Sequence, residues 1–432
     1  MNYLLFFIYL FLICWLLTKI KFIQKTNLGN RTIIILFLLR ILMGFANGWI
    51  NLYYYPTMSD SLSFHVEGIA EYHLMFSDPK EYLLNLFANK SSTSYGAIFD
   101  VTDSFWNNLR SNIIIKLLSL FNIFSNGSYF INVVFYNFLI FFGSVALYRI
   151  FIQIFTERRN TLIITIFLLP SFLYFTSGIH RDGLIFLAIA LVCFNMFCIL
   201  NKEGATLKRV LYIFLSLSLI FLLRNFVFIT IIPALTAWVI AEKKQVPILP
   251  AFITAYVFFG VVFFSLKFIH PKLDLPQYVS ERQLTFVEIA KGGGSSININ
   301  PLFPNFRSFL NNAPQALNHS LMRPYISESK KFLYVPAALE ILIYEILFLG
   351  YIILPLRNFL NHGFIYYGIF FTLSMYLIIG YTIPILGALI RYRSIYFPFV
   401  ITPLSCLIDK KRLYTYYIIL KNNIRYLFFK YH

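Results

Sequence analysis

The feature that most constrains this chain is a series of long apolar segments. They run for about 16 to 25 residues each, the length needed to cross a hydrocarbon layer roughly 30 Å thick. Backbone polar groups inside lipid must bond to one another, so these segments should be helices. The alternating segments of about ten residues that a membrane β-barrel needs are not found. Only 12% of the residues are charged, against roughly 25% in soluble domains, so we predict an all-α integral membrane protein.

The apolar pattern predicts about eleven transmembrane helices within a single polytopic membrane domain, residues 1–432. The expected spans are 3–18, 32–51, 129–150, 161–178, 183–200, 210–223, 226–241, 247–268, 334–355, 364–382 and 391–408. Two long connections, about 52–128 and 269–333, separate some of them. Within the first connection, residues 62–76 and 105–124 carry apolar positions on one face, which is typical of helices lying in the membrane interface.

The basic residues indicate how the chain is oriented. The net charge is +18, but the lysines and arginines lie between apolar segments rather than in a basic, aromatic-rich soluble stripe, so no nucleic-acid partner is expected. One set of alternate short connections holds fifteen basic residues, whereas the opposite set holds four. The richer side should be cytoplasmic. This puts the N-terminus and both long loops outside, and the C-terminus with its basic tail, 409–432, inside.

Several ionisable residues are expected at the outer face, where the charge rule disfavours cations. The tight connection between two spans contains His180, Arg181 and Asp182, and charged side chains at that depth need a partner or a polar cavity. A simple Arg181–Asp182 pair capping two helices is the alternative to a functional site. The other outer arginines are Arg224, Arg323, Arg391 and Arg393. Because guanidinium groups bind phosphate in a bidentate manner, an anionic ligand such as a lipid pyrophosphate would account for this gathering.

Two charges are expected deeper in the membrane. Arg40 lies near the middle of the second span and Glu345 near the middle of the ninth, so we expect them to pair or to line one cavity. Glu340, nearer the outer end, is a further residue that could face the site. The four cysteines (Cys14, Cys193, Cys198 and Cys406) lie inside apolar segments without metal-ligand spacing, and neither a metal nor a cofactor is predicted.

Two short stretches resemble polytopic proteins of bacterial polysaccharide gene clusters. They are Pro170-Ser171-Phe172 through Ser177-Gly178-Ile179-His180-Arg181-Asp182-Gly183-Leu184, and Ile390-Arg391-Tyr392-Arg393 with Pro398 downstream. The proteins they resemble are Wzy-type oligosaccharide repeat-unit polymerases, EpsG-like proteins and GT-C glycosyltransferases. The motifs cover about a tenth of the chain. The layout of short spans and external loops is similar over most of it.

This resemblance implies a transferase that uses polyprenyl-(pyro)phosphate-linked sugars at the outer face of the bacterial inner membrane. GT-C enzymes carry an essential acid in the first external loop, and Asp60 holds a corresponding place if an N-terminal span has been added. Wzy-type polymerases rely on external arginines with an acid or a histidine, which suits Arg181, Arg224, Arg391 and His180. Envelope polysaccharide assembly proteins are the expected partners, together with membrane lipid and the lipid-linked glycan.

The chemistry would need a base for an acceptor hydroxyl and cations for the departing phosphate. The catalytic candidates are Asp60, His65, His180 and Asp182, and the substrate-binding candidates are Arg181, Arg224, Arg323, Arg391 and Arg393. Two alternatives stay open at this point. A transporter or flippase for a lipid-linked glycan would also bind pyrophosphate but should show a polar path through the spans, and a non-catalytic scaffold would not require the outer arginines.

Overall fold

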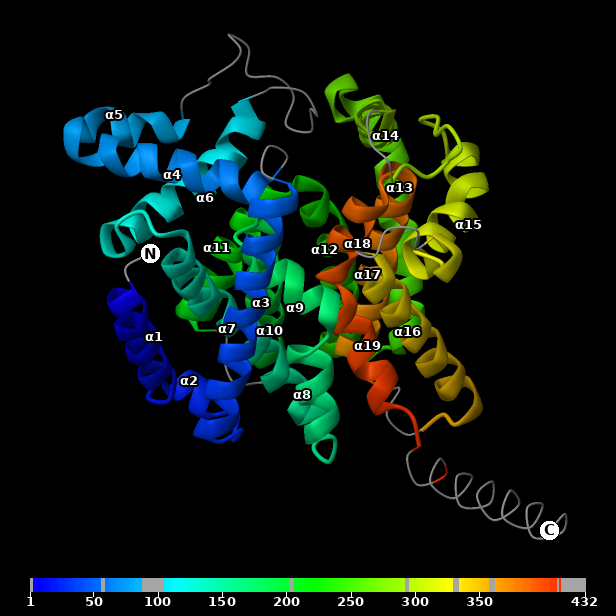
Figure 1. The fold of residues 1–432 in the computed structure, drawn as a ribbon. Helices are drawn as coiled ribbons and strands as arrows, with labels where there is room; N and C mark the ends of the chain where they lie inside the picture. The colour runs from blue at the N-terminus through cyan, green and yellow to red at the C-terminus, as the bar shows by residue number, and fades with distance from the viewer. Residues whose placement is uncertain are drawn as a thin grey trace, which may run out of the picture.

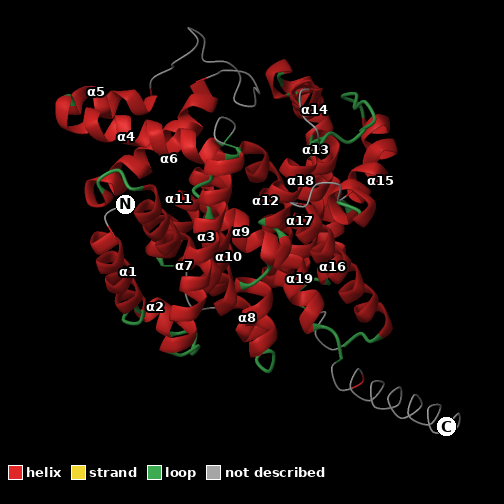
Figure 2. Ribbon diagram, viewed as in Figure 1, coloured by secondary structure: helices red, strands yellow, loops and turns green. Residues whose placement is uncertain are grey.

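The protein is built from helices, as the computed structural model shows (Figures 1 and 2). It describes residues 3–55, 59–87, 105–201, 206–291, 295–328, 334–356, 362–409 and 412. Over these ranges there is no β-strand, only isolated bridges between Ser296 and Ile385 and between Pro355 and Ile408. The all-α prediction is confirmed for this part of the chain. Most of the tail predicted at 409–432 lies outside the described residues.

Seven helices are long and apolar enough to cross a membrane. They are α3 (Asn30–Tyr54), α7 (Tyr129–Ile154), α10 (Arg181–Leu200), α12 (Asn225–Lys244), α13 (Ile248–Ile269), α16 (Val335–Ile353) and α17 (Gly363–Thr382). An eighth span results if α8 (Arg159–Phe167) and α9 (Pro170–Ser177), which meet at a 49° bend, are counted together. By helix length and hydropathy the chain is therefore a multi-pass membrane protein.

The expectation of about eleven spans is too high for the described part of the chain. The segment 3–18 forms α1 (Tyr3–Leu17), whose 15 residues rise only about 22 Å, and 210–223 lies in the 17-residue α11 (Leu207–Leu223). The segment 391–408 is not a single helix. It is divided between α18 (Leu386–Ser394) and α19 (Phe397–Cys406), which starts with a proline in its first turn. Proline favours a helix start, because its missing N–H is not needed there.

The two long connections fold into helical layers at the same end of the molecule (Figure 1). The first contains α4 (Asp60–Ser77), α5 (Pro79–Leu84), η1 (Asn85–Phe87) and α6 (Phe105–Ser125). The second contains η2 (Pro271–Leu273), α14 (Leu275–Lys291), α15 (Phe306–Met322) and η3 (Ile326–Glu328). The helices predicted at 62–76 and 105–124 are confirmed. The short α2 (Lys21–Gln24) and the start of α8 lie at the opposite end.

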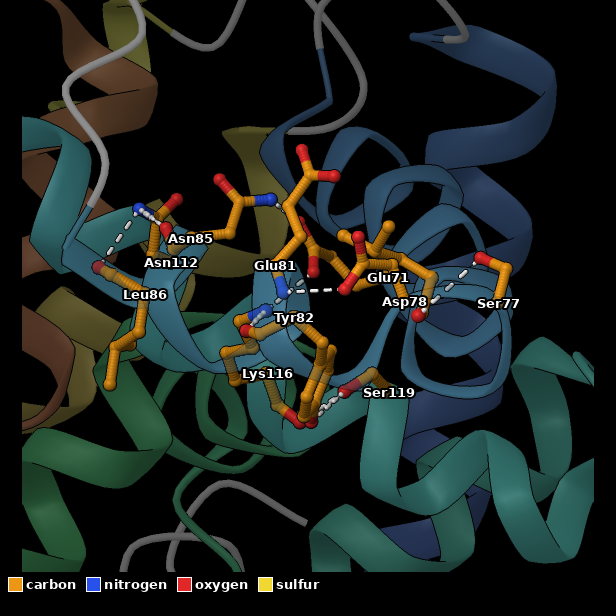
Figure 3. A network of polar contacts seen from close by, with 11 residues as sticks. Glu71, Ser77, Asp78, Glu81, Tyr82, Asn85, Leu86, Asn112, Lys116 and Ser119 are labelled. Atoms are coloured by element: carbon orange, nitrogen blue, oxygen red, sulfur yellow. Dashed lines mark hydrogen bonds and ion pairs between the residues drawn. The ribbon is translucent and has the colours of Figure 1, made fainter.

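A polar network holds the first layer together (Figure 3). The ammonium of Lys116 on α6 contacts a carboxylate oxygen of Glu71 on α4 at 2.5 Å and also donates to the carbonyl of Tyr82. It lies 3.7 Å from the centre of the Tyr82 ring. Glu71 accepts a second bond from Asn85 at 2.6 Å. Because both carboxylate oxygens of Glu71 are used, this acid serves to fix α4, α5 and α6 as one unit.

Candidate functional site

The site is built around the turn between α9 and α10, which contains His180, Arg181 and Asp182. Small residues let this turn pack closely against its neighbours. A side chain added at Gly183 would meet the carbonyl of Thr176 at 2.8 Å, and one added at Gly44 of α3 would meet the carbonyl of Ser177 at 2.7 Å. Close approach of this kind is typical of small residues in membrane helices. The hydroxyl of Tyr136 on α7 donates to the carbonyl of His180 and holds the turn in place.

Two deep charged residues fix the helix that leads into this turn. At the start of α9, Glu340 of α16 accepts hydrogen bonds from the backbone and the hydroxyl of Ser171. At its end, Arg40 of α3 donates to the carbonyl and the hydroxyl of Thr176, at 3.0 and 2.8 Å. An anion at the N-terminus and a cation at the C-terminus both complement the helix dipole. These contacts satisfy groups that α9, only eight residues long, exposes inside the membrane.

The contacts of Arg40 and Glu340 differ from those expected. Arg40 was predicted to pair with Glu345 or to share a cavity with it, but its contacts in the described structure are with Thr176. Glu340 is buried against α9 and Tyr344, whose hydroxyl donates to it at 2.5 Å, and the only outer arginine whose charge reaches it in the described structure is Arg393. The sequence placed Arg40 deep in the membrane but revealed neither its partner nor that of Glu340, because the groups they bind are exposed only where α9 begins and ends.

Asp182 lies at the centre of the outer charges. Its carboxylate is fully buried and contacts two arginines from distant parts of the chain, Arg224 at 2.8 Å and Arg391 at 2.6 Å. Since Asp182 stands in the first turn of α10, the helix dipole also stabilises its negative charge. The alternative in which Arg181 and Asp182 pair to cap two helices is not what the structure shows. Asp182 instead joins α10 to α18 and to the α11–α12 junction.

Asp60 is the acid of the site that solvent reaches. It begins α4, and its carboxylate contacts Arg391 at 3.2 Å while its side chain remains 57% exposed. The surrounding protein alone would raise its pKa, but the charges of Arg391, His180 and Arg181 outweigh this and lower the pKa below its ordinary value. Asp60 is therefore ionised at neutral pH. Arg391 bridges the buried Asp182 and the accessible Asp60, and these contacts raise its own pKa further.

Arg181 takes a different direction from its neighbour Asp182. Its guanidinium donates to the hydroxyl of Ser111 on α6 at 3.0 Å and lies 5.1 Å from the ring of Phe64 on α4. Arg110, one residue before Ser111, donates to Asn107 at 2.7 Å. Burial, followed by the charges of Arg282, Arg181 and Arg224, lowers the pKa of Arg110 to about 10. The first helical layer thus lies directly over the turn and adds a cation to it.

Arg282 on α14 is a member of the site that the sequence analysis missed. It lies 4.3 Å from the ring of Phe226, which Arg224 also approaches, at 5.6 Å. Burial and the charge of Arg224 lower its pKa to about 10, so it stays cationic at neutral pH. Arg282 lies in the long second loop, far from any motif, and no spacing pattern singled it out. In the described structure, the cluster comprises two aspartates, Asp60 and Asp182, and five arginines that influence one another or these acids: Arg110, Arg181, Arg224, Arg282 and Arg391.

Two of the predicted substrate-binding arginines lie apart from this cluster. Arg393 is almost fully buried, and it donates to the carbonyls of Ser320 and Arg323 at the end of α15. Arg323 in turn contacts Glu328 at 3.1 Å. Arg391 and Arg393 are two positions apart on one helix and therefore point to different sides of it. Arg393 therefore connects α18 to α15, whereas Arg391 connects α18 to the charge cluster.

The two histidine candidates differ in their surroundings. His180 is buried beneath the cluster, and burial together with the charge of Arg391 lowers its pKa to about 3 despite the two nearby aspartates. It is therefore neutral at physiological pH and a weak base. His65 packs edge-on against Tyr129, with 5.2 Å between ring centres, and burial lowers its pKa as well. Its ring contact is with α7 rather than with the charged residues.

No group of three or more His, Cys, Asp or Glu side chains among the described residues has the arrangement needed to hold a metal ion. The arrangement can instead bind an anion, because five arginines outnumber two aspartates. Comparison with protein-family models, with curated proteins and with solved structures finds no match to this chain.

Proposed function

We propose that this chain is a membrane glycosyltransferase or oligosaccharide repeat-unit polymerase that acts on polyprenyl-(pyro)phosphate-linked sugars at the outer face of the bacterial inner membrane. The observation that carries the proposal is the cluster of five arginines with the accessible carboxylate of Asp60 at its edge. Such a cluster suits a phosphate or pyrophosphate, and the long apolar helices suit a substrate held in the membrane.

Asp60 is the best candidate for the base. In the proposed reaction its carboxylate takes the proton of an acceptor sugar hydroxyl as the new glycosidic bond forms. The bond between the donor sugar and its phosphate breaks, and the arginines stabilise the charge that develops on the leaving group. Asp182 suits a positioning role, because its buried carboxylate is already bound to Arg224 and Arg391. His180 suits this role less well than Asp60, because it is buried whereas more than half of the Asp60 side chain is exposed.

The orientation belongs to the same proposal. The end of the molecule that carries both loop layers would face outward, and the end near α2 and the start of α8 would face the cytoplasm. Basic residues support this orientation, since Lys21, Arg158 and Arg159 lie at the α2 and α8 end. The N-terminus would then be outside and the C-terminus inside. The charge cluster contacts α4 and α6. In the proposed orientation it would therefore lie at the outward end, within reach of the headgroup of a membrane lipid.

One observation favours an enzyme over a lipid-linked glycan transporter. A transporter should use ionisable residues along a polar path through the spans, and the sequence placed Arg40 and Glu345 deep enough for such a path. Arg40 instead binds the end of α9 and fixes the turn below the cluster, while Glu340, expected nearer the outer end, binds the start of α9. Charged side chains that fix the ends of a helix support a rigid site at one face of the membrane rather than a polar path through it.

The proposal is tested by replacing Asp60 with Asn and Arg181 with Gln. Transfer of sugar from a polyprenyl-pyrophosphate-linked donor should fall by at least about 100-fold in Asp60→Asn, because a positioned base contributes about 10²–10⁴-fold. The same variants should fail to restore envelope polysaccharide in cells while still inserting into the membrane. Arg307→Gln, at an exposed arginine of α15, is the matched control. Normal polysaccharide length and amount in both site variants would overturn the enzymatic proposal.

A further inference from the structure

A cleft opens beside Arg282, between α12, α13, α14 and α17. Its walls are mostly apolar and include Phe226, Ile229, Phe263 and Ile378, with Arg282 and Asn225 among the polar lining residues. The cavity itself measures about 40 Å³, and the other empty space between its lining residues includes the open surroundings. Three of the four helices that line it (α12, α13 and α17) are candidate membrane spans. The cleft therefore combines a membrane-embedded apolar wall with a single guanidinium.

The cation in this cleft has no carboxylate against it. Among the described residues, no acid contacts Arg282, and its Nε is buried without a hydrogen-bond partner. The guanidinium lies against two rings instead, 4.3 Å from the centre of Phe226 and 5.2 Å from that of Phe286. Arg224 and Arg391, by contrast, each contact a carboxylate. Arg282 thus keeps its full set of donors for a ligand, held in a fixed plane by the aromatic rings.

The cleft lies next to the charge cluster, and Phe226 is the residue that relates the two. Arg224 contacts Asp182 at 2.8 Å and lies 5.6 Å from the ring of Phe226, whereas Arg282 lies over the same ring. In the described structure, Phe226 is therefore close both to Arg224, which contacts a carboxylate, and to Arg282, which does not. A headgroup at Arg282 would lie beside the Asp182 cluster, and an attached chain would extend along the apolar wall formed by Ile229 and Phe263.

We propose that this cleft holds the proximal isoprenoid segment of the lipid-linked substrate, with Arg282 donating to its phosphate. The inference rests on the proposed function, since it names the site for the lipid part of that substrate. An inorganic phosphate would use the charge but not the wall, and an uncharged prenyl alcohol would use the wall but not the charge. A ligand that uses both the charge of Arg282 and the apolar wall should therefore bind more tightly than inorganic phosphate or a prenyl alcohol alone, and a lipid phosphate is such a ligand.

The test measures binding rather than turnover. Full-length protein in nanodiscs of phosphatidylcholine is titrated with farnesyl phosphate, inorganic phosphate, farnesol and phosphatidylglycerol, and bound ligand is counted by native mass spectrometry. Arg282→Gln should weaken farnesyl phosphate binding by about tenfold or more, because a charge-assisted hydrogen bond is lost. Ile229→Trp fills the wall without changing the charge and should weaken farnesyl phosphate binding while leaving phosphate binding unchanged. Arg282→Lys should bind farnesyl phosphate more tightly than Arg282→Gln but less tightly than the unaltered protein. The control is Arg307→Gln, at an exposed arginine, which should bind as the unaltered protein does.

The outcomes separate this inference from the function on which it rests. If Arg282→Gln and Ile229→Trp both bind farnesyl phosphate normally, the cleft is not the lipid site, whatever the sugar-transfer assays show. Equal binding of phosphatidylglycerol, with the same losses in both variants, would also overturn it, because the cleft would then be a general anionic lipid site. Loss of farnesyl phosphate binding alone supports the inference even where Asp60→Asn leaves glycan assembly intact and the enzymatic proposal fails.

Discussion

The guanidinium of Arg391 donates through Nε to Oδ2 of Asp182 at 2.6 Å, between residues 209 positions apart in the sequence. The same guanidinium reaches Asp60 at 3.2 Å, so one side chain of α18 joins the start of α10 to the start of α4. Asp182 has no solvent exposure, whereas Asp60 is more than half exposed. The contact with buried Asp182 therefore fixes the guanidinium of Arg391, which in turn positions the accessible carboxylate of Asp60.

Removing the buried carboxylate should destabilise the protein strongly. Asp182→Asn would leave Arg224 and Arg391 beside an uncharged amide, and breaking one member of a buried ion pair costs about 3–5 kcal/mol. We expect a clear drop in Tm in detergent for this variant. Glu288→Gln is the matched control, because Glu288 pairs with Lys291 at the surface, where such a pair contributes about 0–1 kcal/mol. Equal Tm values for the two variants would contradict the central role of Asp182.

Arg391 and Arg393 should differ in what they affect. Arg391→Gln removes the contacts to Asp182 and Asp60 and should lower both Tm and substrate binding, whereas Arg393→Gln removes bonds to carbonyls at the end of α15 and should lower Tm alone. Each lost charge-assisted hydrogen bond is worth about 1.5–3 kcal/mol. Parallel measurement of lipid-phosphate affinity and Tm checks the split. A larger affinity loss in Arg393→Gln than in Arg391→Gln would contradict it.

The cap at the end of α9 should contribute measurably to stability. Arg40→Met removes the donor to Thr176 and leaves a carbonyl in the membrane interior unsatisfied, at a cost of about 1–3 kcal/mol. Arg31→Met on the same helix is the control, since Arg31 is exposed at the start of α3. Thermal unfolding in detergent compares the two. If Arg31→Met is the more destabilising change, Arg40 does not cap α9 in the way described.

His180 should make the protein less stable in mild acid. Its pKa is about 3 in the folded protein, below the ordinary value near 6.5, so the unfolded chain binds the proton first as the pH falls. Stability linked to this histidine is complete above about pH 6.5 and declines toward pH 3. His180→Gln should therefore show a smaller fall in Tm between pH 7.5 and 5 than the unaltered protein. The control is His73→Gln, at an exposed histidine of α4, which should leave that fall unchanged.

The proposed orientation can be measured with single cysteines in a chain whose four native cysteines are replaced by serine. Lys291→Cys, at the end of α14, should react with a membrane-impermeant maleimide applied to intact inner membrane from the outer side. Lys21→Cys, in α2, should react only after the membrane is disrupted. The reverse pattern would invert the assignment of the outer face and, with it, the place of the proposed reaction.

The sequence by itself determined the class of fold. Apolar length decides whether a helix can span a membrane, so α3, α7, α10, α12, α13, α16 and α17 were all anticipated. Local amphipathic spacing likewise predicted helices at 62–76 and 105–124. The residues of the α9–α10 turn stood out because charges at such a depth are costly without partners. These inferences depend only on the order of nearby residues in the sequence and on the cost of placing polar groups in lipid.

The tertiary structure alone decided which charges meet. Arg391 and Arg393 are nearly adjacent in sequence, but the helix turns them toward different partners, Asp182 for one and the end of α15 for the other. Arg282 joined the cluster because α14 packs against α17 and α13, which brings its side chain to Phe226 of α12, a long-range arrangement that no local pattern encodes. Partner choice depends on how helices pack, and that packing is settled by side chains far apart in the chain. The sequence could therefore indicate that cations gather at one face, while only the fold distinguished Arg224 and Arg391, which carboxylates hold, from Arg282, whose donors face no acid among the described residues.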